Sequence, residues 1–431
     1  MTNCCIREWE YLPIMDLGGG QDTISRAQAD RLLSVARLAS RRLNLGAGEH
    51  ILFDGHTNLR AGQVVGLIVA GGVTLEILPK IDEKSVGRTR ENLVRMLARS
   101  LNLPIADGEL SQLGTQAHDL LEVLIGLFCR RLFDALRRGL PRHYVSHEDD
   151  LRAMRGRLDL VRQFTTLAAM PQKLACRFEE LSPDISTNRI MKTAVMRLRR
   201  LARTADNQRR LIELEFAFAD VTEVQRNQIP WDRVIIDRTN RAWADLLALA
   251  KLLLGDRFQT TSSGAALGFS LLFEMNTLFE EFVGRTLQAT LPRERGTVTL
   301  QGPKRHALTD LNGTSRFAMY PDIVIQGPCG DWIIDTKWKR LKGAIDNPKH
   351  GVSQADVYQM MAYANVYRCK NLVLLYPYHE GLDREAGWIA DFAINETQAR
   401  LVIASVDLSH ISSVSTQLAK IVRSDILRFA A

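Results

Sequence analysis

The chain has 431 residues, 46% of them hydrophobic and 24% charged, so it is long enough for two or three domains that each bury a core. Its formal net charge of +7 at pH 7 suits a nucleic-acid partner without requiring one. The apolar runs are too short for a membrane span, the first residues lack a signal-peptide pattern, and no cysteine pair has zinc-site spacing, so we expect a cytoplasmic protein without membrane contact.

The first segment, residues 1–110, is predicted to be rich in β-strands with one helix. The helix is expected at residues 27–45, where apolar side chains recur at helical spacing. Two apolar runs, 64–69 and 73–78, flank a pair of glycines, and this pattern predicts a tight hairpin. We therefore expect a β-rich N-terminal domain.

The second segment, residues 111–265, is predicted to be helical and rich in arginine. Residues 120–136 and 188–205 each carry apolar side chains at helical spacing. The second of these predicted helices holds five arginines that few acids offset. Such a run is either a solvated helix face or a surface that contacts phosphate groups, and its position in the chain does not distinguish the two.

The third segment, residues 266–431, is predicted to alternate helices and strands. We expect a helix at 271–287, strands at 320–325 and 332–338, a second helix at 354–366 and a strand at 371–376. This order predicts a sheet covered by helices on its faces. The predicted fold class is therefore a multi-domain α/β protein in which a β-rich domain, a helical middle region and an α/β domain follow one another.

An acid and a lysine separated by one residue occur twice, as Asp82 with Lys84 and as Asp335 with Lys337. Only the second pair ends an apolar strand, on which residues two apart project from the same face. Asp322 opens the preceding strand, and the turn between the two strands predicts that they pair antiparallel. We therefore expect Asp322 and Asp335 to lie within reach of each other.

Two converging carboxylates beside a lysine form a set of groups suited to a divalent metal ion. Mg²⁺ prefers oxygen ligands and keeps several waters for a phosphate substrate. The lysine can orient the attacking water and offset charge on the transition state. An acid next to a lysine is also the usual composition of a simple surface ion pair, so further features are needed to support a site.

The sequence resembles the PD-(D/E)xK nuclease superfamily at Pro321-Asp322 and at the Asp335-to-Lys337 tripeptide. On the following predicted helix, Gln359 and Tyr363 match the Q-x-x-x-Y motif of the RecB-like branch. Because these two residues are four apart, they share one helix face. The resemblance implies a C-terminal nuclease domain, residues 266–431, with a mixed sheet flanked by helices.

Nucleases of this branch often carry a further acid on the preceding helix. Glu280 is the favoured candidate, and Glu281 is expected to be a solvated residue. The metal expected from the resemblance is Mg²⁺, with Mn²⁺ as the alternative. The implied metal ligands are Asp322, Asp335 and Glu280. The implied catalytic set adds Lys337, Gln359 and Tyr363.

Short segments along the rest of the chain resemble McrC proteins. They are residues 75–81 (LEILPKI), 155–158 (RGRL), 187–192 (TNRIMK) and 375–377 (LYP). The chain is thus similar, from about residue 60 to 380, to the nuclease subunit of McrBC-like, 5-methylcytosine-specific type IV restriction systems. The first fifty residues match no known pattern.

This resemblance implies a partner, a McrB-like AAA+ GTPase expected as a hexameric ring that translocates DNA and reads it. McrC-like chains dock into that ring through their N-terminal part and stimulate its GTPase. By analogy, Asn58 and Arg60 are candidate contacts, and the alternative is an ordinary solvated turn. The chain has no G-x-x-x-x-G-K-[ST] loop, so we expect it to bind no nucleotide itself.

Three functions are compatible with these patterns. The favoured one is a Mg²⁺-dependent endonuclease that cuts double-stranded, modified DNA together with the GTPase. The second is a stand-alone PD-(D/E)xK nuclease of DNA repair or processing. The third is a non-catalytic activator with a nuclease-like fold, and the intact set of Asp322, Asp335 and Lys337 argues against it. The recognised modification and the stoichiometry with the motor have no signal in the sequence.

Overall fold

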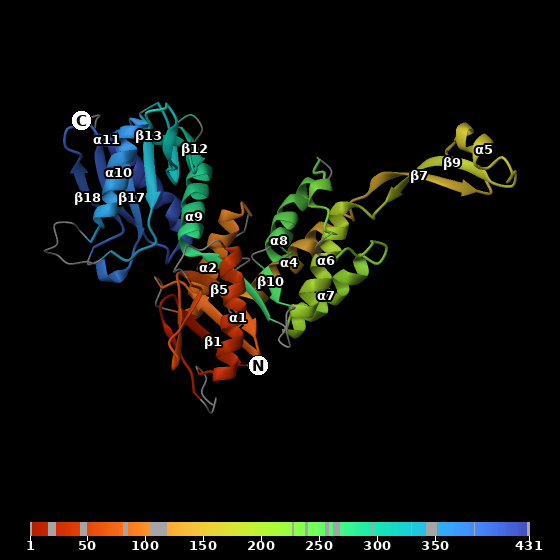
Figure 1. Cartoon of the computed structure of the whole chain (residues 1–431), viewed down its shortest axis with the longest axis horizontal. Coiled ribbons are helices and arrows are strands. Elements are labelled where there is room, and N and C mark those ends of the chain that lie inside the picture. Colours follow the sequence, from red (N-terminus) through yellow and green to blue (C-terminus); the bar gives the residue numbers. More distant parts are fainter. Residues whose placement is uncertain are drawn as a thin grey trace. The chain divides into compact units, whose positions relative to one another are not determined.

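Figure 1 shows the computed structural model of the chain. The residues that it describes are 2–15, 23–43, 50–80, 85–103, 119–225, 228–237, 240–254, 258–261, 268–292, 294, 296–328, 330–341, 351–382 and 384–428. The domain boundaries predicted at 110/111 and 265/266 lie outside these residues, and so does the first acid–lysine pair, Asp82 and Lys84.

The chain forms two compact units. Unit 1 comprises Met1–Leu121 together with Asp256–Ala431, and unit 2 comprises Glu122–Gly255. The first and last thirds of the chain thus fold together, whereas the sequence predicted three consecutive domains. Among the helices that the structure describes, none is long and apolar enough to span a membrane.

Unit 1 contains a five-stranded sheet in the order β1-β6-β5-β11-β10. Its strands are β1 (Thr2–Arg7), β5 (Val64–Ala70), β6 (Val73–Leu78), β10 (Phe258–Thr261) and β11 (Gly268–Glu274). The predicted hairpin is confirmed, because β5 and β6 pair antiparallel. Gly71 and Gly72 form its turn with φ of +60° and +80°, a left-handed conformation that glycine adopts without steric cost.

The helix predicted at 271–287 begins later than expected, because its first residues form β11. The run from Gly268 to Phe273 is almost entirely apolar, and an apolar run of this length fits a buried strand as well as a helix. β11 pairs antiparallel with β5 and buries its side chains in the sheet. This pairing joins the last third of the chain to the first.

The sheet is covered by α1 (Arg26–Arg42), which contacts β5 and β11. Ser25 caps the helix in a capping box with Gln28. The prediction of a helix at 27–45 is confirmed as far as residue 42, and its last two residues lie outside the described chain. A three-stranded sheet lies beside α1 and contacts it through β3. Its strands are β2 (Tyr11–Pro13), β4 (Asn58–Ala61) and β3 (Leu52–Asp54).

The rest of unit 1 is built on a six-stranded mixed sheet in the order β12-β15-β16-β17-β19-β18. Its strands are β12 (Thr297–Leu300), β15 (Ile323–Gln326), β16 (Trp332–Thr336), β17 (Asn371–Pro377), β18 (Gly387–Ala393) and β19 (Arg400–Val406). β16, β17 and β19 are parallel to one another, and the other pairings are antiparallel. The predicted antiparallel pairing of the two motif strands, β15 and β16, is confirmed.

Helices cover both faces of this mixed sheet. On one face α10 (Gln354–Tyr367), which confirms the helix predicted at 354–366, packs Met360 and Tyr363 into a core with Val324. On the other face α9 (Met275–Thr290) approaches Ile323, the neighbour of Val324, so closely that a side chain at Gly284 would collide with Leu300. α2 (Val86–Ser100) and α11 (Val414–Arg428) also contact α9.

A separate two-stranded hairpin, β13 (Arg305–Thr309) and β14 (Ser315–Met319), connects β12 to β15. Almost all of its residues are exposed. Short 3-10 turns complete unit 1 at Glu380–Leu382 and Ile411–Ser413.

Unit 2 contains four longer helices and two short 3-10 turns. They are α4 (Leu120–Leu136), α6 (Ser186–Leu201), α7 (Ala205–Ala217), α8 (Ala244–Leu254), Trp231–Arg233 and Arg241–Trp243. The predicted helix at 120–136 is confirmed. The buried Glu122 on α4 accepts hydrogen bonds from Arg203 N, Thr204 Oγ1 and Asn207 Nδ2, which ties α4 to the start of α7.

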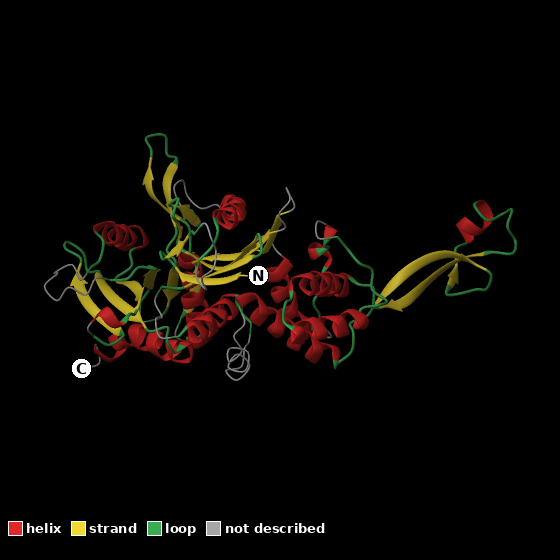
Figure 2. Cartoon of the chain, turned by 90° about the horizontal axis from the view of Figure 1, so that it is seen from below, coloured by secondary structure: helices red, strands yellow, loops and turns green. Residues whose placement is uncertain are grey.

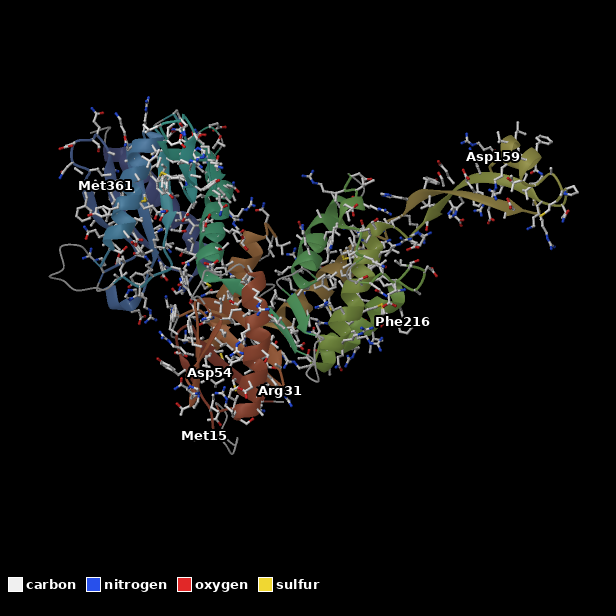
Figure 3. All side chains as sticks on the ribbon, in the orientation of Figure 1. Met15, Arg31, Asp54, Asp159, Phe216 and Met361 are labelled. Atoms are coloured by element: carbon white, nitrogen blue, oxygen red, sulfur yellow. The ribbon has the colours of Figure 1, made fainter. Side chains whose placement is uncertain are left out.

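The sequence predicted a helical middle segment, but the structure also contains a long hairpin there. β7 (His143–Leu151) pairs with β9 (Leu174–Ser182), and β8 (Arg157–Leu158) and α5 (Leu160–Thr165) lie at the far end. The hairpin extends away from the helices of its unit (Figure 2), and Asp159 marks its far end in Figure 3. Half of the residues of β7 and β9 are exposed and only the adjacent Ala175 and Cys176 are buried, so neither strand shows the apolar alternation by which strands are detected.

Candidate active site

The two predicted acids meet at neighbouring ends of β15 and β16. Ile323 pairs with Ile334, so Asp322 stands opposite Asp335 in the continued register. Asp322 Oδ2 accepts hydrogen bonds from the backbone N and from Oγ1 of Thr336, both at 2.8 Å. These two bonds hold the Asp322 carboxylate against Thr336, the residue that follows Asp335.

Asp335 is a buried carboxylate with few groups to satisfy it. Its exposed fraction is 0%, so bulk water does not solvate its oxygens. Lys337 Nζ approaches Oδ2 at 2.6 Å as an ion pair. Burial, and then the charge of Asp322, raise the pKa of Asp335 to about 7, although Lys337 opposes this shift. Burying such a group is costly unless a partner compensates it, and a cation is the natural partner.

Lys337 stands between this acid and α10. Its side chain is 19% exposed, and Nζ donates a hydrogen bond to Gln359 Oε1 at 3.0 Å. Burial lowers the pKa of Lys337, but the facing carboxylate of Asp335 more than offsets this effect, so the net shift is upward. The lysine is therefore held as a cation at a fixed position.

Gln359 and Tyr363 extend the network along one face of α10, as their spacing predicted. Gln359 Nε2 donates to the Tyr363 hydroxyl at 3.0 Å, and that hydroxyl donates to Tyr320 O at 3.1 Å. Tyr320 lies two residues before Asp322. The contacts thus run from Asp335 through Lys337 and back to the strand that carries the first acid.

Glu280 on α9 belongs to the same electrostatic cluster. Burial raises its pKa to about 7, and the nearby charges of Asp322, Glu281 and Asp335 add to this shift. Its Oε1 accepts a hydrogen bond from Gln301 Nε2 at 3.2 Å. Glu280 therefore lies on the side of α9 that faces the two motif acids.

The acids present fit a hard divalent cation better than zinc, because they offer oxygen ligands without histidine or cysteine. In the part of the chain that the structure describes, no three acidic, histidine or cysteine side chains converge closely enough to form a metal cage. Mg²⁺ does not require such a cage, since it is commonly held by one or two carboxylates, waters and the substrate phosphate. Asp322 and Asp335 meet that requirement.

Sequence reasoning missed the residues that hold the far side of the motif strand. Trp338, which directly follows Lys337, is 1% exposed and packs on Phe279 with ring centroids 5.4 Å apart. Its Nε1 donates to both carboxylate oxygens of Glu8, at 3.2 and 2.9 Å. Its carbonyl oxygen accepts from Gln63 Nε2 at 3.3 Å. No local pattern connects Glu8 or Gln63 to a residue so distant in sequence.

The acid beneath the site, Asp356 on α10, was also missed. It is 7% exposed, and Lys339 Nζ lies 3.0 Å from its Oδ2. The Tyr376 hydroxyl donates to the same oxygen at 3.4 Å. Asp356 lies three residues before Gln359, a position that belongs to no motif in the sequence. Only its burial and its contacts in the structure reveal its role in holding α10 against the sheet.

The two predicted partner contacts lie elsewhere in unit 1, on β4. Asn58 pairs with Pro13 and Arg60 pairs with Tyr11. The Arg60 guanidinium lies over the rings of Trp9 and Tyr11, 5.0 and 5.6 Å from their centroids. These residues therefore belong to a strand of the small sheet and not to a free turn.

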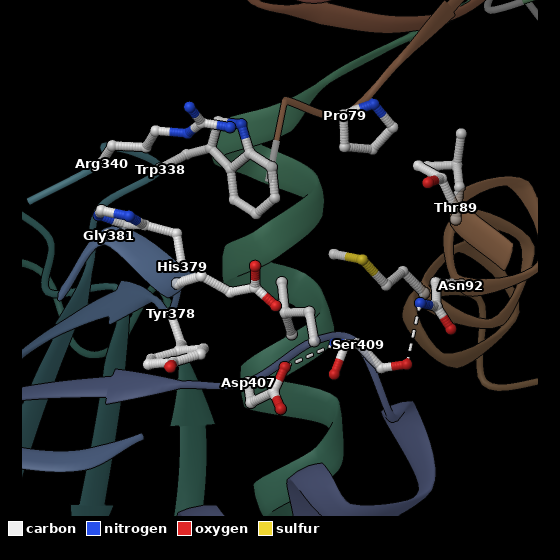
Figure 4. Close-up of a pocket in the computed structure, with 14 residues that line it drawn as sticks. Pro79, Thr89, Asn92, Trp338, Arg340, Tyr378, His379, Gly381, Asp407 and Ser409 are labelled. Carbon is white, nitrogen blue, oxygen red and sulfur yellow. Dashed lines mark hydrogen bonds between the residues drawn. The ribbon is translucent and has the colours of Figure 1, made fainter. Parts of the chain in front are cut away.

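A cavity of about 600 Å³ opens on the other side of Trp338 (Figure 4). α2 contributes Asn92, whose Nδ2 donates to Ser409 O at 3.3 Å across one edge. Trp338 and Arg340 line it, but Asp322, Asp335 and Lys337 do not. The cavity is therefore separate from the cluster of acids.

The chain as a whole is similar to proteins of a restriction system. A family model described as "McrBC 5-methylcytosine restriction system component" matches residues 59–377. A solved structure from Thermococcus gammatolerans, a half-complex of a tetradecameric assembly of McrB AAA+ hexamers with bound McrC, is similar with a TM-score of 0.76 and 21% identity over 98% of this chain and 100% of that one. The McrBC complex of the same organism matches with a TM-score of 0.56 and 25% identity over 68% and 88% of the two chains. No curated protein sequence matches the chain.

Proposed function

Because this chain belongs to the family of McrBC 5-methylcytosine restriction system components, we propose that it is the nuclease subunit of such a system. It would hydrolyse phosphodiester bonds of modified, double-stranded DNA with Mg²⁺, in a complex with a McrB-like AAA+ GTPase. The similar structures that contain McrB hexamers with bound McrC support this choice of partner.

The observation that carries the proposal is the buried, poorly satisfied Asp335 between Asp322 and Lys337. Burial of this carboxylate opposite a second acid costs folding free energy, because its exposed fraction is 0% and Lys337 offsets the cost only in part. Strained electrostatics of this kind are typical of catalytic sites. The set also matches the acid, acid, lysine pattern of PD-(D/E)xK nucleases.

Each residue has a role that follows from its contacts. Asp322 and Asp335 would hold the Mg²⁺ ion, which supplies charge stabilisation at the phosphate and lowers the pKa of a bound water. Lys337 orients the attacking water and offsets the negative charge that develops on the phosphate oxygens. Gln359 fixes the position of the Lys337 ammonium group, Tyr363 fixes Gln359, and Glu280 serves as the third acid.

The first expected result concerns the dependence on the motor. The isolated chain hydrolyses no GTP and cuts DNA very weakly, because it has no phosphate-binding loop and its family acts as a component of a complex. Addition of a McrB-like AAA+ protein from the same organism should produce cleavage of a methylated plasmid with GTP and Mg²⁺, measured on agarose gels. An unmethylated plasmid is the control.

GTP hydrolysis by the purified single chain, at rates typical of motor proteins, would contradict this assignment. Efficient cleavage by the chain alone, unchanged by the AAA+ protein, would favour the second candidate, a stand-alone repair or processing nuclease. The comparisons favour the first candidate, since the matching family is a restriction system component.

The far end of the long hairpin is a second candidate surface for the motor, besides Asn58 and Arg60. None of the six residues of α5 is buried, and Val161 and Phe164 are 75% and 74% exposed. Apolar patches of this kind mark interaction sites. Asp159 caps α5 and forms an ion pair with Arg177 at 2.6 Å, which ties α5 to β9.

We expect Phe164→Asp to weaken binding of the AAA+ protein at least tenfold, because it places a charge in an apolar contact. Phe216→Asp is the matched control, since Phe216 on α7 (Figure 3) is an equally exposed phenylalanine, at 76%. Binding is measured by interferometry, with stimulated GTPase activity as a second readout. Loss of binding in Arg60→Ala but not in Phe164→Asp would instead assign the contact to β4.

A further inference from the structure

The hairpin formed by β13 and β14, residues 305–319 and called the arm below, has no core of its own. All five residues of β13 and four of the five in β14 are exposed. The exposed side chains include the apolar Leu308, Leu311 and Phe317, at 59%, 107% and 71%. An isolated two-stranded hairpin is marginally stable in water, so the arm depends on its base and on whatever it contacts.

The base of the arm is attached to the helix that lines the candidate active site. The Tyr367 hydroxyl on α10 donates to Met319 O at 2.8 Å, and the Arg305 guanidinium lies over the Tyr367 ring, 4.9 Å from its centroid. One turn earlier on α10, Tyr363 binds Tyr320 O. The arm therefore ends within three residues of Asp322 and is fixed to the same helix as Gln359.

Phe317 has a backbone conformation that the arm itself does not require. Its φ is +57°, in the left-handed region, which costs a bulky side chain roughly 1 kcal/mol. The strand pairing is interrupted there, since His306 pairs with Ala318 and Leu308 with Arg316, but the positions between them are unpaired. No burial compensates this cost, because the ring is 71% exposed. Strain that persists without a packing reason is typical of ligand contacts.

The arm also carries a charge and a chemistry that suit nucleic acid. Residues 304–320 hold three basic side chains, Lys304, Arg305 and Arg316, against one acid, Asp310. Lys304 Nζ lies over the Tyr320 ring at the base of the arm, 5.9 Å from its centroid, and Arg316 forms an ion pair with Asp310 at 3.2 Å. Basic groups contact phosphates, a phenylalanine ring makes apolar contact with thymine methyl groups, and a two-stranded ribbon fits the major groove of B-DNA.

We propose that the arm lies in a groove of duplex DNA beside the phosphate to be cut, with Phe317 packed against the DNA and Lys304 on its backbone. This inference rests on the proposed nuclease function and adds a substrate contact to it. The arm fixes which phosphate reaches Asp322 and Asp335, because it is anchored to the same helix as the site.

The test uses Phe317→Asn, because asparagine tolerates the left-handed backbone and lacks the ring. In the full chain carrying Asp335→Asn, which prevents cleavage, Phe317→Asn should leave the melting temperature equal or higher. Its affinity for a fluorescein-labelled duplex oligonucleotide, measured by anisotropy with Mg²⁺ at low salt, should fall about fivefold or more. Lys304→Ala should reduce the slope of log affinity against log salt by about 1.

The matched control is Leu308→Asn, which changes an exposed apolar residue on the opposite face of the same arm. It should bind the oligonucleotide like its parent. In the complex with the AAA+ protein, Phe317→Asn in the otherwise unchanged chain should also raise KM for DNA and spread the positions of the cuts on sequencing gels.

Three results would overturn the inference. They are DNA binding by Phe317→Asn equal to that of its parent, an equal loss of binding in Leu308→Asn, and a loss of AAA+ binding in place of DNA binding. Failure of the proposed function is distinguishable from these results. An unaltered chain that never cuts DNA with its partner removes the nuclease assignment, whereas cutting that Phe317→Asn leaves unchanged removes only the role of the arm.

Discussion

Asp335→Asn should abolish DNA cleavage and at the same time make the protein more stable in the absence of Mg²⁺. The carboxylate of Asp335 is fully buried, and burial together with the charge of Asp322 raises its pKa. Burial and the charges of both acids also raise the pKa of Glu280. A neutral amide of the same shape removes this repulsion. We expect cleavage to fall by at least about two to three orders of magnitude, as for other groups that stabilise transition-state charge directly.

The two effects are measured separately. Cleavage is followed with the AAA+ protein present, and thermal unfolding with EDTA, where a gain of about 1 kcal/mol corresponds to roughly 1 to 2 °C for a chain of 431 residues. The control is Asp331→Asn, an exposed acid just before β16, which should change neither property. Cleavage near the unaltered rate in Asp335→Asn would remove this residue from the active site.

Lys337→Arg should be nearly as inactive as Lys337→Ala, although it keeps the positive charge. Nζ occupies a confined position, 2.6 Å from Asp335 Oδ2 and 3.0 Å from Gln359 Oε1. The planar guanidinium is too large for this position, and its pKa prevents proton transfer. Both variants should lose at least about a hundredfold in rate, a loss typical of a charge that acts on the transition state.

The measurement is single-turnover cleavage at saturating Mg²⁺, which removes differences in product release. Lys339→Arg is the matched control, because Lys339 is 55% exposed and its ammonium group forms an ion pair with Asp356. It should keep most of its activity. An active Lys337→Arg variant would show that Lys337 is a structural ion-pair partner and would weaken the nuclease assignment with it.

The motif strands were predictable because everything that defines them is local. Asp322 and Asp335 are thirteen residues apart, the turn between them is short, and the apolar residues of β15 and β16 are continuous. Antiparallel pairing across a short turn fixes which residues stand opposite each other. The helical spacing of Gln359 and Tyr363 likewise predicted that they share one face of α10. On that face Gln359 accepts a hydrogen bond from Lys337 and donates one to Tyr363.

The parts that sequence reasoning missed depend on contacts between distant segments. β11 is a strand because β5, some two hundred residues earlier, offers it an open edge, and an apolar run alone does not reveal this. The β7–β9 hairpin lacks a buried face and therefore lacks an apolar alternation. Glu8 belongs to no recognisable sequence motif, and only the fold brings it into contact with Trp338.

Both ends of the chain contribute to unit 1, so recombination within the gene can separate residues that contact each other. A recombination event within the middle third would join a Glu8 and a β5 from one ancestor to a Trp338 and a β11 from another. Exchange of the whole segment Glu122–Gly255 would leave every one of these contacts intact. Across this family we therefore expect the middle segment to diversify as a cassette, while substitutions at the two ends of the gene occur in concert.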